Sequence, residues 1–282
     1  MRYLYGDDFV DDDIDARLDV GVHDRYTIYG YSGDDLLAGW DRADIIYGGS
    51  GWDDIYGDAG NDRLYGQDGS DLIRGETGND TIYGGDGDDD LAGGSGNDVI
   101  QGGDSGADIL SGNAGNDLLQ GGSDLDLLEG GSGKDTLYGG DGADDLYGDD
   151  DADQLHGGDG LDSIEGNAGN DKLYGDDNDD LLKGGSGNDS LIGGNNDDLL
   201  YGNAGADRFY YRDGYDTDRV EDFVRGVDKI VIDVTGIDSF ADIHARMNTD
   251  HGDTEIDFGG NDELFITGLK AFQLHASDFI IL

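Results

Sequence analysis

One position in every nine is always apolar over most of the length of this chain. Gly48-Gly-Ser-Gly-Trp-Asp-Asp-Ile-Tyr56 is followed directly by Gly57-Asp-Ala-Gly-Asn-Asp-Arg-Leu-Tyr65, and Gly184-Gly-Ser-Gly-Asn-Asp-Ser-Leu-Ile192 repeats the pattern much later. Twenty such nonapeptides run from Gly30 to Tyr210, and the one from Gly102 to Ser111 carries an extra residue. A fixed period of this kind predicts a solenoid in which equivalent residues stack.

Four positions of the nonapeptide define its chemistry. Position 1 is Gly and position 6 is Asp in all twenty units, and position 8 is always apolar, as in Leu37, Ile46 and Phe209. Position 4 is Gly in most units. The exceptions are Asp124, Asp151, Asn178 and Asn196, with Arg42 as the real departure and Ser105 in an ambiguous register beside the insertion. Asp and Asn tolerate left-handed backbone better than other residues, so position 4 is predicted to be a tight turn.

The pattern predicts strands and excludes helix. An interior Gly costs a helix about 1 kcal/mol relative to Ala, so a six-residue Gly-rich stretch does not form one. Three residues with a central apolar side chain indicate a short strand that buries one face. Two nonapeptides then make a coil of 18 residues. The predicted fold is all-β, a right-handed parallel β-roll of two sheets with position 8 between them and a small mixed C-terminal cap.

The repeat resembles that of the repeats-in-toxin (RTX) calcium-binding β-roll family. The resemblance implies ions between the turns of neighbouring coils, held by position-6 carboxylates and backbone carbonyls. Nine gaps on each edge allow up to about 18 Ca²⁺, with weak or missing sites expected at Arg42 and at the insertion. The candidate metal ligands are Asp35, Asp44, Asp53, Asp62, Asp71, Asp80, Asp89, Asp98, Asp108, Asp117, Asp126, Asp135, Asp144, Asp153, Asp162, Asp171, Asp180, Asp189, Asp198 and Asp207.

Composition narrows the partners to cations. The net charge is −51, which excludes nucleic acid as a natural partner and disfavours anionic lipid. Only six of the 67 acidic residues are Glu, and Asp has the shorter arm that suits a metal held in a tight turn. Cys is absent and the five His residues are scattered, so no transition-metal site recurs.

Folding is expected to depend on calcium. One apolar side chain in nine residues buries too little surface to offset the ordering of the backbone, and stacked aspartates repel one another. We therefore predict a chain that is unfolded or collapsed without calcium. Extracellular calcium modules bind with dissociation constants of about 10⁻⁴–10⁻³ M, so folding is expected only outside the cell.

The two ends depart from the repeat. Residues 1–29 are predicted to cap the roll at the N-terminus; Gly21 to Tyr29 is a degraded nonapeptide with Tyr26 in place of Asp, and Arg2 to Gly6 resembles a strand ending. In residues 211–282 we expect two strands within Arg219–Ile232 and a helix from Phe240 to Met247 capped by Ser239. A hairpin of Thr254–Phe258 and Glu263–Thr267 should follow.

The C-terminal region is similar to that of serralysin-type secreted proteins. The chain ends Asp278-Phe-Ile-Ile-Leu282, and the resemblance implies a signal for type I export machinery and secretion from a Gram-negative bacterium. A purely structural alternative is a terminal strand that closes the cap, and the two roles are compatible. No apolar stretch is long enough to span a membrane.

Catalytic motifs are not found. The chain has no His-Glu-x-x-His and no Gly-x-Ser-x-Gly, and adjacent carboxylates such as Asp34 and Asp35 are expected from the Asp content. Tyr recurs at position 9, where ring packing is favoured over sugar stacking. The first hypothesis is a secreted non-catalytic calcium-binding protein, and Met1 favours a complete chain. The alternatives are the export module of a larger protease, lipase or alginate epimerase, and an extracellular adhesin or glycan-binding module.

Overall fold

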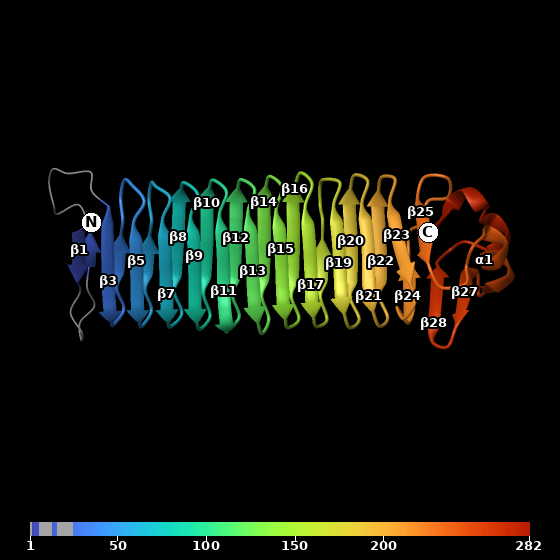
Figure 1. The fold of residues 1–282 in the computed structure, drawn as a ribbon, viewed down its shortest axis with the longest axis horizontal. Coiled ribbons are helices and arrows are strands. Elements are labelled where there is room, and N and C mark those ends of the chain that lie inside the picture. Colours follow the sequence, from blue (N-terminus) through green and yellow to red (C-terminus); the bar gives the residue numbers. More distant parts are fainter. Residues whose placement is uncertain (1, 6–12, 16–24) are drawn as a thin grey trace. The chain divides into compact units, whose positions relative to one another are not determined.

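The computed structural model describes residues 2–5, 13–15 and 25–282, and the chain divides into two compact units, Met1–Asp145 and Leu146–Leu282. Both units are built from parallel strands joined by turns (Figure 1). In each unit the strands form two sheets, called here sheet A and sheet B. The predicted division at residues 29/30 and 210/211 stays a prediction.

In the first unit, successive strands alternate between the sheets. Sheet A contains β1 (Arg2–Tyr5), β3 (Tyr26–Ser32), β5 (Ile45–Ser50), β7 (Arg63–Asp68), β9 (Thr81–Asp86), β11 (Val99–Ser105), β13 (Leu118–Ser123) and β15 (Thr136–Asp141). Sheet B contains β2 (Asp13–Asp15), β4 (Leu36–Ala38), β6 (Asp54–Tyr56), β8 (Leu72–Thr77), β10 (Asp90–Ser95), β12 (Ile109–Ala114) and β14 (Leu127–Ser132).

In the second unit the strands also alternate between two sheets, and sheet B includes antiparallel strands. Its sheet A contains β17 (Gln154–Asp159), β19 (Lys172–Asp177), β21 (Ser190–Asn195), β23 (Arg208–Arg212), β25 (Lys229–Asp233) and β29 (Phe279–Ile281). Its sheet B contains β16 (Asp145–Asp150), β18 (Ser163–Glu165), β20 (Leu181–Ser186), β22 (Leu199–Ala204), β24 (Thr217–Val220), β28 (Asp262–Ile266), β27 (Asp253–Gly259) and β26 (Met247–Asp250).

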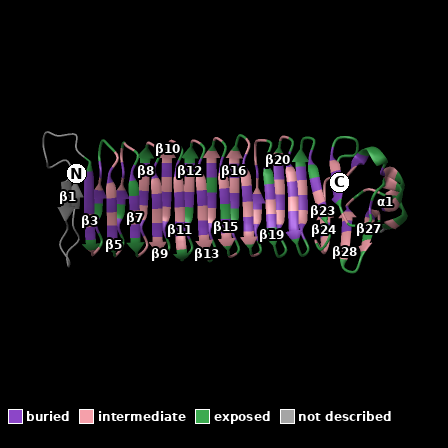
Figure 2. Cartoon of the chain, viewed as in Figure 1, coloured by how far each residue is buried: buried purple, intermediate pink, exposed green. Residues whose placement is uncertain are grey.

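Register confirms the 18-residue coil. Ile46 pairs with Leu64 between β5 and β7, and Leu173 pairs with Leu191 between β19 and β21, in both cases as parallel neighbours. Every position-8 side chain from Leu37 to Phe209 is at most 1% exposed, so these residues form the core between the sheets. Figure 2 shows this arrangement as buried strand centres flanked by exposed turns.

Most strands are longer than the three residues predicted. They extend through positions 1–3 of the following nonapeptide, as in β5, because these residues also pair with the neighbouring coil; Gly49 pairs with Gln67. The backbone is left-handed at position 4, as predicted, for Asp124, Asp151, Asn178, Asn196 and Arg42. It is also left-handed at position 2, where Gln67 has φ 84°.

The expected C-terminal elements are present. Helix α1 (Phe240–Arg246) begins at Ser239, whose side chain accepts a hydrogen bond from the Asp242 N–H, and it ends one residue earlier than predicted because Met247 begins β26. Strands β27 and β28 form the predicted antiparallel hairpin. Strand β29 pairs with β25, which confirms the terminal strand. Two 3-10 helices lie at Ala271–Gln273 and Ala276–Asp278.

The N-terminal residues that the structure describes agree with the degraded repeat in part. Thr27-Ile28-Tyr29 lies within β3, Ile28 is fully buried, and the Tyr26 N–H donates to Asp44 Oδ1 (2.6 Å). Residues 21–24 of that nonapeptide lie outside the described residues. No helix in the described parts of the chain combines the length and the apolar character of a membrane span.

Candidate metal centre

All twenty predicted ligands are buried. Each position-6 Asp lies at the end of a turn, just before a strand, and none is more than 3% exposed. Asp is rarely buried unless a partner compensates its charge. The repeat therefore places a row of buried carboxylates along each edge of each unit.

In the first unit these carboxylates form two ladders. The Asp53 N–H donates to Asp71 Oδ1 (2.8 Å), and the Asp71 N–H donates to Asp89 Oδ1 (2.7 Å). The same bond recurs from Asp35 to Asp144 along one edge and from Asp44 to Asp135 along the other. Each aspartate after Asp35 thus uses Oδ1 to accept a hydrogen bond from the backbone of the coil before it.

The second unit has two further ladders of the same kind. On one edge the Asp162 N–H donates to Asp180 Oδ1 (2.8 Å) and the Asp180 N–H donates to Asp198 Oδ1 (2.9 Å). The other edge runs from Asp153 to Asp207. These hydrogen bonds are made by the side chain and are additional to the β-sheet pairing.

The second carboxylate oxygen is the decisive feature of the ladders. Oδ2 is buried and has no hydrogen-bond partner in Asp44, Asp53, Asp62, Asp71, Asp80, Asp89, Asp98, Asp117, Asp126, Asp171, Asp180, Asp189, Asp198 and Asp207. A buried carboxylate oxygen without a partner is costly, and a bound cation is the usual compensation.

Glycine at position 1 is required by the same carboxylate. A Cβ on Gly57 would lie 2.7 Å from Asp62 Oδ2 and 2.9 Å from the carbonyl oxygen of Gly75, one coil further on. A Cβ on Gly166 would meet Asp171 Oδ2 and the Gly184 carbonyl oxygen, each at 2.6 Å. Carboxylate and carbonyl oxygens of neighbouring coils therefore converge beside position 1.

Burial raises the pKa of the ladder carboxylates. Loss of solvent raises the pKa of Asp62 to about 8, against the effect of the hydrogen bond from the Asp44 N–H, and repulsion from Asp80 and Asp44 adds to the shift. Burial raises the pKa of Asp89 and Asp180 to about 8 in the same way. The ionised ladder is unfavourable by itself, and a divalent cation reverses this preference.

The donor set fits calcium. Among the described residues, no three His, Cys, Asp or Glu side chains form a group that holds a metal. An ion at an edge would therefore take carboxylates from two neighbouring coils together with backbone carbonyls. Ca²⁺ accepts six to eight oxygen ligands of this kind in flexible geometry, whereas Mg²⁺ demands a nearly ideal octahedron.

The two irregular nonapeptides, one with the inserted residue and one with Arg42, keep the ladder. The inserted residue is accommodated by a bulge between Gly103 and Ser105, so that Gly106 takes position 4 with φ 112° and the Asp89 N–H still reaches Asp108 Oδ1 (2.9 Å). However, Asp108 Oδ2 does not belong to the buried unpartnered set. Arg42 adopts φ 132° and keeps the turn. Weak binding at these two places stays a prediction.

Two ladder residues were missed by the sequence analysis. The Asp198 N–H donates to Asp218 Oδ1 (3.3 Å) and the Asp207 N–H donates to Asp228 Oδ1 (3.0 Å), so both ladders of the second unit continue beyond residue 210. Asp-Arg-Val220 and Asp-Lys-Ile230 repeat the pattern of positions 6–8, which was the available signal. Gly is absent at position 1 in both, and this hid them.

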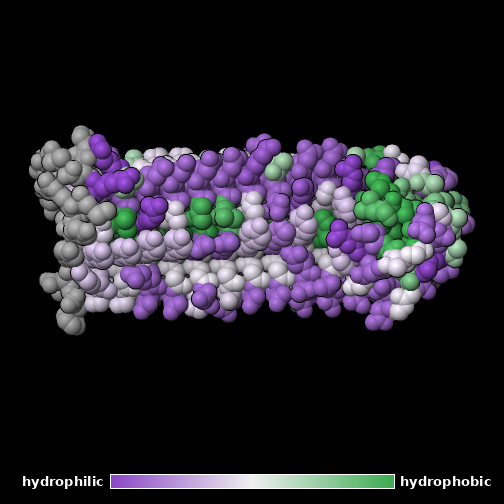
Figure 3. All heavy atoms as spheres, in the orientation of Figure 1, coloured by the Kyte–Doolittle hydropathy of each residue, from purple (hydrophilic) through white to green (hydrophobic). Residues whose placement is uncertain are grey.

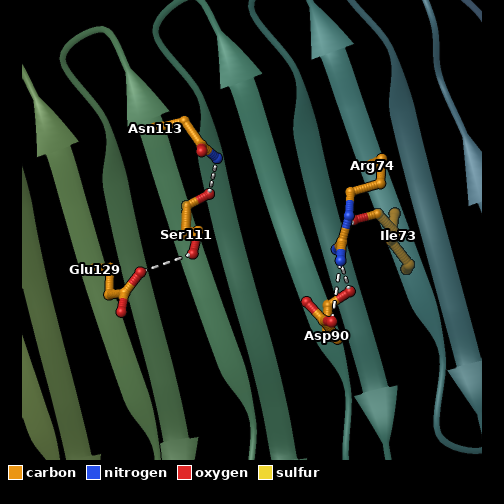
Figure 4. A network of polar contacts seen from close by, with 6 residues as sticks. All are labelled: Ile73, Arg74, Asp90, Ser111, Asn113 and Glu129. Atoms are coloured by element: carbon orange, nitrogen blue, oxygen red, sulfur yellow. Dashed lines mark hydrogen bonds and ion pairs between the residues drawn. The ribbon is translucent and has the colours of Figure 1, made fainter.

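The outer sheet faces carry packed rings and polar pairs. Tyr47, Tyr65 and Tyr83 stack at 4.8 and 5.0 Å between centroids, so these rings pack on one another as predicted. In the second unit His156 stacks on Tyr174 at 4.2 Å. Figure 4 shows two of the polar pairs in the first unit, Arg74 with Asp90 (3.0 Å) and the Ser111 hydroxyl with Glu129 (3.4 Å).

A comparison with protein families identifies the repeat. The family model described as "RTX calcium-binding nonapeptide repeat (4 copies)" matches residues 29–64, 65–100, 102–137, 121–155, 147–182, 156–191 and 183–218. This chain belongs to the RTX calcium-binding nonapeptide repeat family. RTX repeats bind Ca²⁺ and are typical of secreted extracellular proteins, so the prediction of multiple calcium ions is confirmed.

Solved structures with RTX repeats are similar to parts of the chain. The extracellular lipase LipA from Serratia marcescens is 18% identical with a TM-score of 0.33, over 95% of this chain and 42% of the lipase. The AlgE6R3 subunit of the Azotobacter vinelandii mannuronan C5-epimerase is 26% identical with a TM-score of 0.30, over 48% of this chain and 78% of that subunit. The chain thus spans less than half the length of the lipase. No match was found among curated proteins.

Proposed function

We propose that this chain is a secreted, non-catalytic RTX protein whose β-roll folds when many Ca²⁺ ions bind outside the cell. The ligands are the twenty position-6 aspartates from Asp35 to Asp207, together with backbone carbonyls of adjacent coils. The observation that carries the proposal is the row of buried Oδ2 atoms without a hydrogen-bond partner. Each ion would neutralise the carboxylates of two neighbouring coils and so hold the coils together.

Binding and folding are one process in this proposal. The ligands of one gap belong to residues 18 apart, such as Asp62 and Asp80, which are neighbours only after the coils have stacked. The unfolded chain has no such sites, so the free energy of calcium binding stabilises only the folded state. At cytosolic calcium the chain would stay unfolded.

The side chains of the roll support a non-catalytic role. Most of the aspartates at position 6 already accept a backbone hydrogen bond through Oδ1 within the ladders. His156 packs on Tyr174 and contacts Asp176 through Nδ1 (3.2 Å). His244 lies within α1 and packs edge-on against Phe240 (5.9 Å between ring centroids).

The C-terminus supports export before folding. Asp278 is 1% exposed and accepts hydrogen bonds from the N–H groups of His275 (2.8 Å) and Gly226 (3.2 Å). Strand β29 follows at once and pairs with β25. An exporter that reads Asp278 and Phe279 therefore has access to them only in the unfolded chain, whereas Leu282 is exposed in the folded chain as well. A signal role and a strand role are compatible because they act at different times.

The proposal is tested by a calcium titration followed by circular dichroism. Protein collected from culture medium is stripped with chelator at pH 7, and bound metal is counted by equilibrium dialysis. We expect a coil spectrum in chelator, a cooperative gain of β signal at about 10⁻⁴–10⁻³ M Ca²⁺, and up to about 18 ions per chain. Mg²⁺ at the same concentration is the control and should not fold the chain. A full β signal in excess chelator would refute the proposal.

A further inference from the structure

We propose that Asp218 forms one further calcium site with Asp198, and that Asp228 closes the opposite ladder without an ion. The inference rests on the proposed function and concerns residues that lie beyond the twenty nonapeptides. It assigns different chemistry to two aspartates that occupy the same position of the coil. The difference follows from what each second carboxylate oxygen contacts.

Asp218 has the features of a ligand. Its side chain is fully buried, its Oδ1 accepts the hydrogen bond from the Asp198 N–H, and its Oδ2 has no hydrogen-bond partner. Asp198, one coil earlier, is 2% exposed and its Oδ2 also lacks a partner. Two buried carboxylates therefore adjoin, as in the ladder step from Asp180 to Asp198, and here the two carboxyl groups also contact each other. The ladder bond and the unpartnered Oδ2 repeat those of the metal-binding coils, although Asp213 and not Gly occupies position 1 of this coil.

Asp228 has the opposite features. Its Oδ1 accepts from the Asp207 N–H (3.0 Å), and its Oδ2 accepts from the Val224 N–H (2.6 Å), so both oxygens are occupied. Position 1 of this coil is Phe223 instead of Gly, and the ring is 6% exposed and packs against Phe209 at 6.2 Å. In this coil the Phe223 ring thus takes the place that Gly has elsewhere. The Val224 N–H occupies the carboxylate oxygen that has no hydrogen-bond partner elsewhere.

The site at Asp218 has a structural consequence for the C-terminal hairpin. Asp218 lies in β24, which pairs with β28 through Asp218–Leu264 and Arg219–Phe265. The Arg219 guanidinium also lies over the Phe265 ring at 4.8 Å. Because β24 is the strand that joins the roll to the β27–β28 hairpin, an ion between Asp198 and Asp218 would fasten this hairpin to the last coil. Without the ion, repulsion between the carboxylates would loosen it.

Ion counts in three variants test the inference. Asp218→Asn keeps the Oδ1 acceptor and removes the charge, and it should bind one Ca²⁺ fewer than the wild type at saturation. Asp198→Asn removes a carboxylate that would serve two ions, one between Asp180 and Asp198 and one between Asp198 and Asp218, so this variant should bind two Ca²⁺ fewer. Asp228→Asn is the matched control at the equivalent position and should lose none. Ions are counted by equilibrium dialysis on chains whose circular dichroism shows the roll to be folded.

Hydrogen exchange supplies the second measurement. At a calcium concentration that half-saturates the wild type, Asp218→Asn should speed amide exchange in β27 and β28 at least tenfold, while exchange in the first unit is unchanged. The inference is overturned if Asp218→Asn binds as many ions as the wild type, if Asp198→Asn loses only one, or if Asp228→Asn loses one. Failure of the wild type itself to bind Ca²⁺ would instead overturn the proposed function.

Discussion

Acidification should replace calcium as the agent that folds the roll. The ladder carboxylates have an ordinary pKa of 3.8, and burial raises it to about 8 for Asp62, Asp89 and Asp180 in the folded chain. A group whose pKa is raised by folding binds more protons in the folded state than in the unfolded state at intermediate pH. The metal-free fold therefore gains stability as pH falls from about 8 towards 4, and loses it as pH rises through the folded pKa.

The magnitude is large enough to decide whether the chain folds. One pKa unit corresponds to about 1.4 kcal/mol. Lowering the pH from 8 to 5 therefore stabilises the metal-free folded chain by roughly 3 to 4 kcal/mol for each of these three carboxylates. Together they reach the order of 10 kcal/mol, which is comparable with the whole stability of a typical domain. Calcium binding has the opposite pH dependence, because a carboxylate must be ionised to bind the ion. The affinity for Ca²⁺ should therefore decrease as the pH is lowered.

The assay is circular dichroism of the chelated chain between pH 8 and pH 5, above the pI of about 4.1 where precipitation interferes. We expect a coil spectrum at pH 8 and a growing β signal as the pH is lowered. Calcium added at pH 5 should release protons, and calcium added at pH 8 should release none. A chelated chain that stays a coil at pH 5, with no proton release on binding, would refute the burial argument.

Three substitutions test the parts of the coil. Asp89→Asn removes a buried carboxylate between two gaps and should bind two fewer Ca²⁺ with a higher folding midpoint, whereas the exposed neighbour Asp88→Asn should match the wild type in dialysis. Gly57→Ala brings a Cβ to 2.7 Å from Asp62 Oδ2 and should lower the Tm in calcium, with Ser50→Ala as the unaffected comparison; an unchanged Tm would contradict the close packing at position 1. Leu119→Ala should cost about 2–5 kcal/mol in calcium-loaded denaturation and the outward-facing Leu118→Ala under about 1, and equal costs would argue against the assigned core face.

The sequence was informative about the coil because each repeat packs against other copies of the same sequence pattern. A residue in one nonapeptide contacts the equivalent residue 18 positions away, so the period alone placed Leu119 in the core and Asp89 in a ladder. Local signals also sufficed for α1, where Ser239 caps the first turn, and for the hairpin of β27 and β28. These elements depend on residues close in sequence.

The tertiary structure decided what the period does not encode. The third antiparallel strand β26 was not predicted, and the apolar side chains that gather in the C-terminal region have no periodicity to guide their placement (Figure 3). The clearest case is the pair Asp218 and Asp228, which share one position of the coil. We infer different roles for them because the Val224 N–H reaches Oδ2 of Asp228, whereas no donor reaches Oδ2 of Asp218. Such contacts depend on how the chain turns after the last repeat, where stacking no longer repeats the same neighbour.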